Sequence, residues 1–197
     1  MPSLVLASSN AGKLTELTSL LAPLGWTLQL QSELGVPDAP EPHASFVENA
    51  QAKARWASSR TGLPALSDDS GIVVNALQGA PGVRSARYAC ASDAAPRSDA
   101  RNNAKLLAAL KNTPDRSAQF VCVLVYLRHA ADPLPIIAQG VWSGQILLAP
   151  SGANGFGYDP LFFDPKLGMS VAALSSEQKN RHSHRGQAIR ALLAQLV

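Results

Sequence analysis

Two adjacent aspartates in the first half of this chain are the residues best suited to chemistry. They belong to a polar interruption between two apolar runs, residues 65–67 and 72–74, which consists of Asp68, Asp69, Ser70 and Gly71. Adjacent carboxylates repel each other unless positive charge lies between them. Mg²⁺, which takes oxygen ligands, commonly provides that charge. The same residue types are frequent in turns, so an acidic turn joining two strands is the alternative interpretation.

A polar loop near the N-terminus is the second candidate. Residues 3–8 form a short β-rich run, and leucines at 14, 17, 20, 21 and 24 then follow helical spacing. A loop that enters a helix N-terminus can bind an anion through free backbone N–H groups, and Lys13 would add a cation. The loop is not a Walker A motif, because Ala7 and Leu14 stand where that motif needs glycine and serine or threonine. A capped helix with a solvated lysine is the alternative.

Two later segments could recognise a base. The glycine-rich stretch 152–159 carries aromatic residues that could stack on a base, and Asp159 could accept hydrogen bonds. Further along, His184 and Arg185 could donate to the 6-oxo group of a purine. His182 and His184 are two residues apart, which does not match the helical spacing of a zinc pair. A tight loop with buried aromatics, followed by an ordinary helix start, is the alternative.

The elements that must position these residues alternate between strands and helices. Ser45 and Glu48 form a capping box that predicts a helix to about residue 60, on which Glu48 and Lys53 could form surface ion pairs. Further helices are expected at about 98–111, after Ser175 or Ser176, and at 187–196. Strands are expected at 118–128, at 135–148 and on both sides of the two aspartates. The fold class is therefore α/β with a mixed sheet.

Composition restricts the class of protein. The chain has 197 residues, 46% of them hydrophobic, and a net charge of +3, which suits a globular protein with a large core. Its lysines and arginines are scattered, which argues against nucleic-acid binding. Cys90 and Cys122 cannot form a disulfide framework. No apolar run approaches the roughly 18 residues of a membrane helix, and the N-terminus lacks signal-peptide features, so we expect a cytoplasmic protein without a membrane partner.

Taken in order, the polar blocks of this chain resemble those of the inosine triphosphate pyrophosphatase family. The resemblance extends from residue 4 to residue 186. The blocks are Ser8-Ser9-Asn10-Ala11-Gly12-Lys13, Glu41, Phe46-Val47-Glu48-Asn49-Ala50, Lys53-Ala54, Asp68-Asp69-Ser70-Gly71, Gly79-Ala80-Pro81-Gly82, Ser85-Ala86-Arg87-Tyr88, Gly155-Phe156-Gly157-Tyr158-Asp159-Pro160, Lys179 and Ser183-His184-Arg185-Gly186.

The resemblance implies a fold and an activity. The fold would be an elongated, two-lobed α/β domain spanning residues 1–197, with helices flanking a long mixed sheet and a substrate cleft between the lobes. The activity would be Mg²⁺-dependent hydrolysis of ITP, dITP and XTP to the monophosphate and pyrophosphate, which removes non-standard purines from the nucleotide pool. A cytoplasmic homodimer is implied as well. The sequence does not rank the three substrates.

The resemblance also assigns roles to residues by matching position. The triphosphate would be bound by Ser8, Ser9, Asn10, Ala11, Gly12 and Lys13. Mg²⁺ would be served by Glu41 and Asp69 with Asp68 nearby, Asp69 would be the general base, and Ser70 would contact substrate. The base and sugar pocket would comprise Phe156, Gly157, Tyr158, Asp159, Lys179, His184 and Arg185. The chain departs from the family at Ser8-Ser9, where Thr-Gly is common, and at Pro42-His43, where Thr-Gly usually follows the glutamate.

Two other functions are compatible with parts of this pattern. One is a related pyrophosphatase acting on dUTP or modified pyrimidines, against which the blocks at 156–159 and 184–185 argue. The other is a nucleotide sensor that binds without turnover, against which the intact acidic residues and Lys13 argue.

Overall fold

The computed structural model describes residues 3–9, 13–14, 17–18, 21, 25–92 and 95–196. Its contacts divide the chain into two compact units. The first unit comprises Met1–Asp69, Cys122–Gly140 and Arg185–Val197, and the second comprises Ser70–Val121 and Val141–His184. The assignment of residues 1–197 to one domain stays a prediction.

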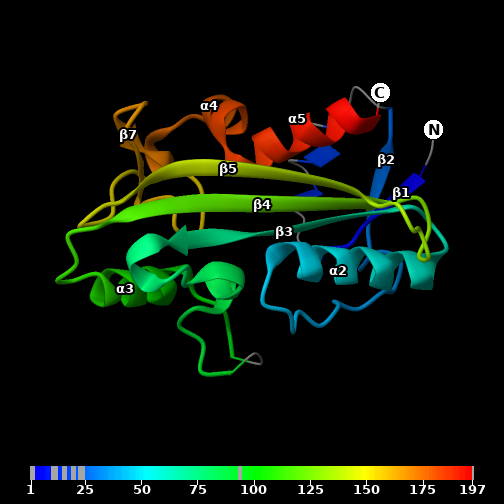
Figure 1. The fold of residues 1–197 in the computed structure, drawn as a ribbon, viewed down its shortest axis with the longest axis horizontal. Helices are drawn as coiled ribbons and strands as arrows, with labels where there is room; N and C mark the ends of the chain where they lie inside the picture. The colour runs from blue at the N-terminus through cyan, green and yellow to red at the C-terminus, as the bar shows by residue number, and fades with distance from the viewer. Residues whose placement is uncertain are drawn as a thin grey trace. The chain divides into compact units, whose positions relative to one another are not determined.

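Seven strands form one mixed sheet (Figure 1). The strands are β1 (Ser3–Leu6), β2 (Thr27–Leu30), β3 (Ala65–Val74), β4 (Ser117–Leu127), β5 (Ile136–Ile146), β6 (Phe162–Asp164) and β7 (Met169–Ser170). Their order is β2-β1-β3-β4-β5-β6-β7. β1 pairs in parallel with β2 and β3, whereas β6 pairs antiparallel with β5 and β7. The predicted α/β class with a mixed sheet is confirmed.

The two aspartates lie inside a strand, and the predicted turn between two strands is wrong. β3 runs without a break for ten residues, and Asp68 and Asp69 are its fourth and fifth. Both are buried, with 2% and 8% of their surface exposed. Successive side chains on a strand point to opposite faces, so each carboxylate meets different partners. Basic side chains distant in sequence supply those partners, and a local pattern of turn residues cannot reveal them.

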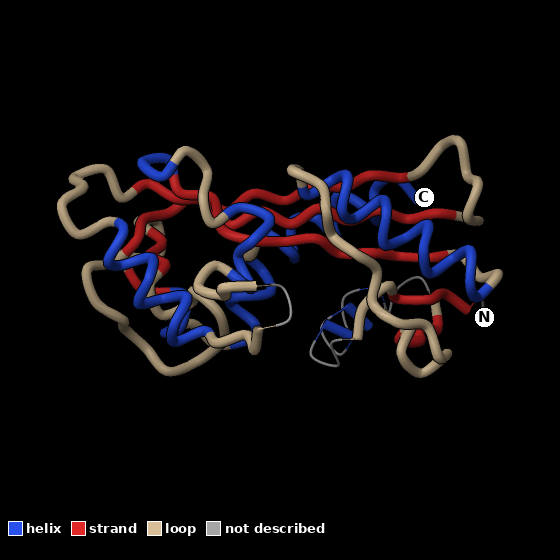
Figure 2. Tube along the Cα trace, turned by 90° about the horizontal axis from the view of Figure 1, so that it is seen from below, coloured by secondary structure: helices blue, strands red, loops and turns tan. Residues whose placement is uncertain are grey.

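Helices and short 3₁₀ segments connect the strands. The α-helices that the structure bounds are α2 (Phe46–Thr61), α3 (Asp99–Ala109), α4 (Ser176–His182) and α5 (His184–Leu196). The 3₁₀ segments are η2 (Asn75–Leu77), η3 (Gly82–Arg87) and η4 (Val171–Ala173). Residues 13, 14, 17, 18 and 21 are also helical, in agreement with the helix predicted there. α2 lies in front of the strands when the molecule is viewed from below (Figure 2).

Caps fix where these helices begin. Ser45 accepts from the Glu48 backbone N–H at 3.4 Å, and its hydroxyl donates to the Glu48 carboxylate at 2.5 Å. Gly62 ends α2 in the left-handed conformation with φ 70°. Ser175 and Gln178 form a reciprocal capping box at the start of α4. The cap predicted at Ser45 and the alternative at Ser175 are therefore confirmed.

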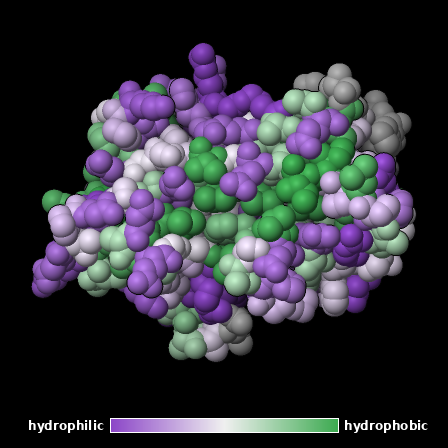
Figure 3. All heavy atoms as spheres, in the orientation of Figure 1, coloured by the Kyte–Doolittle hydropathy of each residue, from purple (hydrophilic) through white to green (hydrophobic). Residues whose placement is uncertain are grey.

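Each unit has its own hydrophobic core. In the first unit, β1, β3 and β4 pack against α5 through residues that include Leu6, Leu66, Leu124, Ile189 and Leu192. The core of the second unit includes residues of β3, β4, α3 and β6. Figure 3 shows hydrophobic residues in the middle of one face and polar residues toward its edges. Within the described ranges, no helix is long and apolar enough to cross a membrane.

Candidate active site

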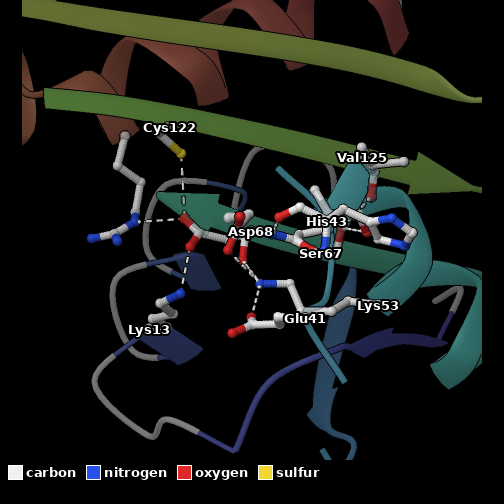
Figure 4. A network of polar contacts seen from close by, with 12 residues as sticks. Lys13, Glu41, His43, Lys53, Ser67, Asp68, Cys122 and Val125 are labelled. Atoms are coloured by element: carbon white, nitrogen blue, oxygen red, sulfur yellow. Dashed lines mark hydrogen bonds and ion pairs between the residues drawn. The ribbon is translucent and has the colours of Figure 1, made fainter. Parts of the chain in front are cut away.

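Asp68 is enclosed by two cations and a thiol in the first unit (Figure 4). Lys13 Nζ donates to its Oδ1 at 2.5 Å, and Arg185 Nε donates to its Oδ2 at 3.0 Å. Cys122 Sγ lies 3.3 Å from the same Oδ2. Both oxygens of this carboxylate are therefore engaged by groups from β4, α5 and the residue Lys13.

The charges around Asp68 keep it ionised. Burial alone would raise the pKa of Asp68, but the charges of Lys13 and Arg185 outweigh burial and hold the pKa well below its ordinary value. Burial, reinforced by the charge of Asp68, raises the pKa of the Cys122 thiol well above its usual range. Cys122 is therefore a protonated core thiol that donates to a carboxylate.

Asp69 lies next to Lys53 and Glu41 instead. Lys53 Nζ donates to Asp69 Oδ1 at 2.8 Å, to Glu41 Oε1 at 2.8 Å and to the Asp68 carbonyl oxygen at 2.8 Å. The other oxygen, Asp69 Oδ2, is buried without a hydrogen-bond partner among the residues that the structure describes. Burial raises the pKa of Asp69 above its ordinary value, and the charge of Lys53 opposes that rise without cancelling it.

Lys53 is a central residue of this cluster, and the surface ion pair that it could have formed with Glu48 is not what the structure shows. Only 8% of its surface is exposed. Burial would lower the pKa of Lys53, but the charges of Asp69 and Glu41 outweigh it and raise the pKa. The sequence held one signal for this position: Lys53 follows Asn49 by four residues and Ala50 by three, so it shares their buried face of α2.

The loop that carries Glu41 is fixed from α2. Asn49, which is 1% exposed, accepts from the His43 N–H at 3.0 Å and donates to the His43 carbonyl oxygen at 3.2 Å. These two bonds hold the backbone two residues after Glu41. Pro42 and His43, where the chain departs from the family pattern, are thus compatible with a defined position for the Glu41 carboxylate.

The carboxylates of Asp69 and Glu41 fit a divalent cation. Asp69 Oδ2 has no protein donor in the described ranges, and Glu41 is exposed. Across the same ranges, no three His, Cys, Asp or Glu side chains are grouped closely enough to hold a metal ion by themselves. Mg²⁺ is usually bound by one or two carboxylates together with substrate phosphates, so two carboxylates suffice. Because its oxygens already bind Lys13, Arg185 and Cys122, Asp68 is less suited to be a ligand.

Part of the predicted phosphate loop lies in the described residues. Ser8 follows β1 and is half-buried, and the hydroxyl of exposed Ser9 donates to Asp38. Gln31 Nε2 donates to the same Asp38 oxygen at 2.8 Å. Asn10, Ala11 and Gly12 lie outside the described residues. The sequence reasoning missed Asp38, which stands in a proline-rich stretch without a motif.

In the second unit, Asp159 organises the glycine-rich loop. It is 4% exposed, and its Oδ2 accepts from the Phe156 N–H at 2.9 Å and from Lys179 Nζ at 2.5 Å. Gly155 has φ 79°, and a Cβ on it would lie 2.0 Å from Asp159 Oδ2. Only glycine allows this close approach. Asp159 and Lys179, predicted from distant segments, are therefore in contact.

The two aromatic residues of this loop differ in their surroundings. Phe156 is 60% exposed, and Lys179 Nζ lies 4.5 Å from its ring centre. Tyr158 is 5% exposed, and its hydroxyl donates to the Ser85 carbonyl oxygen at 2.8 Å. Phe156 can therefore present a ring face to a ligand, whereas Tyr158 is part of the core.

His184 and Arg185 begin α5 but contact different residues. The ring of His184, which is 8% exposed, stacks on Phe120 with a centroid distance of 4.9 Å in the second unit. Arg185 is 3% exposed and binds Asp68 in the first unit. Ser70, the first residue of the second unit, is half-buried on β3. The structure thus groups Arg185 with Asp68, whereas the resemblance grouped it with His184.

These contacts describe an α/β protein. Its first unit gathers carboxylates, lysines and an arginine, and its second unit carries a glycine-rich loop with aromatic residues that Lys179 of α4 contacts. Such a combination is typical of proteins that handle phosphorylated, base-bearing ligands. The sequence profile of the Ham1 family matches residues 4–195. The chain belongs to the Ham1 family.

Relatives and solved structures agree with this assignment over the full length. A dITP/XTP pyrophosphatase from Ralstonia nicotianae is 59% identical and covers 100% of this chain and 96% of that protein. A dITP/XTP pyrophosphatase from Nitrosomonas europaea is 58% identical and covers 100% of this chain and 95% of that protein. The structure of a HAM1 protein from Coxiella burnetii has a TM-score of 0.93 at 47% identity, and the match covers 100% of this chain and 98% of that one.

Proposed function

We propose that this protein hydrolyses the non-standard purine nucleoside triphosphates ITP, dITP and XTP to the monophosphate and pyrophosphate, and so cleans the nucleotide pool. The observation that carries the proposal is the Asp69–Lys53–Glu41 cluster in a chain 59% identical to a dITP/XTP pyrophosphatase over its whole length. A buried carboxylate with a raised pKa is a suitable acceptor for the proton of an attacking water.

We assign the divalent cation, Mg²⁺, to Asp69 and Glu41. When bound, Mg²⁺ would neutralise phosphate charge and polarise the phosphorus that water attacks. Lys53 holds one oxygen of each carboxylate, so the two groups are oriented before any ligand arrives. Asp68 is proposed to orient Lys13 and Arg185, although the family resemblance also placed it near the metal.

Asp69 is proposed to take the proton from the attacking water. The donation from Lys53 to Oδ1 fixes the carboxylate, so the oxygen that faces the cation, Oδ2, is also the one nearest to a water that the cation would place for proton transfer to Asp69. Lys13, whose ammonium group Asp68 holds, supplies positive potential for the triphosphate together with Ser8 and Ser9. Asn10, Ala11, Gly12 and Ser70 keep their proposed contacts from the family pattern.

The second unit is proposed to recognise the base. Phe156 would stack on the purine, which is typically worth about 1–3 kcal/mol. Lys179, held by Asp159, and His184 would supply the donors that a 6-oxo group accepts and a 6-amino group does not. Gly157 and Tyr158 shape the loop, and Arg185 links this segment of the chain to Asp68.

We also propose a cytoplasmic homodimer, which rests on the family resemblance. Light scattering during gel filtration should give about twice the 20.7 kDa of one chain. A mass of one chain across the working concentration range would refute the dimer and leave the catalytic proposal intact.

The proposed activity is tested by measuring pyrophosphate release from ITP, dITP, XTP, ATP, GTP and dUTP, with Mg²⁺ and with EDTA. We expect Mg²⁺-dependent release from the inosine and xanthosine nucleotides and little from ATP or GTP. A preference for dUTP would assign the protein to pyrimidine house-cleaning. Binding of every nucleotide without release would indicate a sensor.

A further inference from the structure

Helix α3 holds the backbone of Gly157 at both of its polar groups. The Gly157 N–H donates to Asp99 Oδ2 at 2.7 Å, and the Gly157 carbonyl oxygen accepts from Asn103 Nδ2 at 2.9 Å. Asp99 and Asn103 are four residues apart, which places them one above the other on one face of the helix. We call these two side chains the α3 clamp. All three residues belong to the second unit.

The helix that carries the clamp is itself firmly anchored. Asn102, which is 2% exposed, accepts from the Ala89 N–H at 2.8 Å and donates to the Ala86 carbonyl oxygen at 3.1 Å. Leu106 is fully buried in the core of the second unit. Ser98 caps the helix start by accepting from the Arg101 N–H at 3.3 Å. α3 is therefore a rigid platform against which a loop can be positioned.

The clamp acts on an exposed loop that other bonds hold on the N-terminal side of Phe156. The Asn154 N–H donates to the Ala172 carbonyl oxygen at 2.9 Å, and the Asn154 side chain donates to the Leu174 carbonyl oxygen at 3.1 Å. Residues 151–156 are exposed, and Gly157 has a positive φ of 62° with no atom within 4 Å of where a Cβ would lie. Asp159 fixes the Phe156 N–H, but Gly157 has no such bond to Asp159 in the described part of the chain. The clamp thus fixes the peptide groups on both sides of Gly157.

Asn103 shows that this position serves more than packing. Its Oδ1 is buried without a hydrogen-bond partner among the described residues. A buried unsatisfied oxygen is unfavourable, and an apolar side chain of similar size would avoid the cost. The Nδ2 donation to Gly157 is the contact that a leucine could not make.

We propose that Asp99 and Asn103 are positioning residues that hold the Phe156–Gly157 backbone in the conformation that receives the purine base. The inference rests on the proposed function, because it holds that the clamp strengthens binding of the base-bearing substrate. A preformed loop avoids the ordering cost of binding, so loss of the clamp weakens binding and leaves the chemistry at Asp69 unchanged.

The test compares four variants with the wild type. Asp99→Ala and Asn103→Ala each remove one half of the clamp. Asp99→Asn keeps an oxygen acceptor for the Gly157 N–H and serves as the rescuing variant. Ala104→Gln changes an exposed residue of the same helix and serves as the matched control.

Two quantities are measured: steady-state kinetics with ITP, and hydrogen exchange of the Gly157 amide by NMR. Asp99→Ala should raise KM by about fivefold, the equivalent of one hydrogen bond, while kcat stays within about twofold. Its Gly157 amide should exchange faster than in the wild type. Asn103→Ala should raise KM similarly, whereas Asp99→Asn and Ala104→Gln should match the wild type in both measurements.

Three outcomes would overturn the inference. These are an unchanged KM in both alanine variants, a fall in kcat at constant KM, and a KM rise that Asp99→Asn does not reverse. If Asp99→Ala fails to fold, Asn103→Ala alone decides. If the wild type itself releases no pyrophosphate from ITP, the proposed function fails. The affinity for ITP measured by calorimetry, together with amide exchange, then decides whether the clamp positions a nucleotide loop.

Discussion

Asp68 and Asp69 are neighbours in the chain but lie in opposite electrostatic environments. Asp68 binds Lys13 and Arg185, which lower its pKa, whereas burial raises the pKa of Asp69 against the opposing charge of Lys53. The difference follows from strand geometry, because successive side chains face opposite sides of β3. One carboxylate is thereby kept ionised for structure, and the other is suited to accept a proton.

Asp69→Asn should reduce pyrophosphate release from ITP by about 10²- to 10⁴-fold, because a general base contributes a factor of that size. Circular dichroism should show an intact fold. Asp115→Asn, which alters an exposed carboxylate, is the matched control and should leave turnover unchanged. Turnover of Asp69→Asn near the wild-type value would remove Asp69 as the base.

The same substitution should increase stability at neutral pH in EDTA. A carboxyl whose pKa is raised in the folded state contributes stability below its unfolded pKa, and this contribution is lost as the pH rises through the folded pKa. The asparagine variant escapes that loss. Urea unfolding from pH 3 to 8 should therefore show that the free energy of unfolding of the variant increases relative to that of the wild type as the pH rises. If the difference between the two free energies does not depend on pH, the raised pKa is contradicted.

Asp68→Asn should destabilise the protein by about 3–5 kcal/mol at neutral pH, because it removes the negative charge that pairs with buried Arg185 and half-buried Lys13. The pKa of Asp68 is lowered in the fold, so its stabilising effect is present above the unfolded pKa and is lost as the pH falls through the folded value. Urea unfolding at pH 7 and at acid pH measures both effects. If Asp68→Asn lowers the free energy of unfolding as much at acid pH as at pH 7, the loss of stability comes from packing and not from charge.

At the scale of elements, periodicity and caps predicted most of the helices and strands, because these signals are local. α3 and α5 follow the expected apolar spacing, and α2 begins at the cap predicted at Ser45. The turn predicted at Asp68–Asp69 failed because their partners, Lys13, Lys53 and Arg185, come from other parts of the chain. Lys53 was missed as a site residue for the same reason.

Gly155→Ala should disrupt the glycine-rich loop 152–159 more than the positive φ of Gly155 alone requires. Its Cβ would collide with the Asp159 carboxylate, whereas a Cβ at Gly168, with a similar φ of 69°, meets nothing within 4 Å. Gly168→Ala should therefore cost only the left-handed strain of about 1–2 kcal/mol. Gly155→Ala should cost more and should also raise KM for ITP. Equal stability losses with equal KM values would contradict the collision.

At the scale of the whole molecule, three strands contribute residues to both compact units. β3 continues from Asp69 to Ser70, β4 from Val121 to Cys122 and β5 from Gly140 to Val141 across the boundaries of the units. Because each of these strands is continuous, unfolding of its part in one unit also frees the strand end on which the hydrogen bonds in the other unit depend. We expect the two units to unfold together.

Single-tryptophan variants test this expectation. The chain has three tryptophans, of which Trp26 and Trp56 lie in the first unit and Trp142 in the second. A variant retaining only Trp56 and one retaining only Trp142 should each give the same urea midpoint by fluorescence as by circular dichroism. Separate midpoints within one variant would show that the units unfold independently.

The opposite orientation of Asp68 and Asp69 also has a consequence for how this sequence can change over generations. The Asp68 side chain is bonded to Lys13, Arg185 and Cys122. The Asp69 side chain is bonded to Lys53, which also bonds Glu41. Compensating substitutions should therefore arise within each of these two sets and seldom between them. Deleting a single residue from β3 before Asp68 would turn Asp68 and Asp69 to the opposite faces of the strand, so that each would meet the partners of the other. We therefore expect the length of this strand to be inherited unchanged.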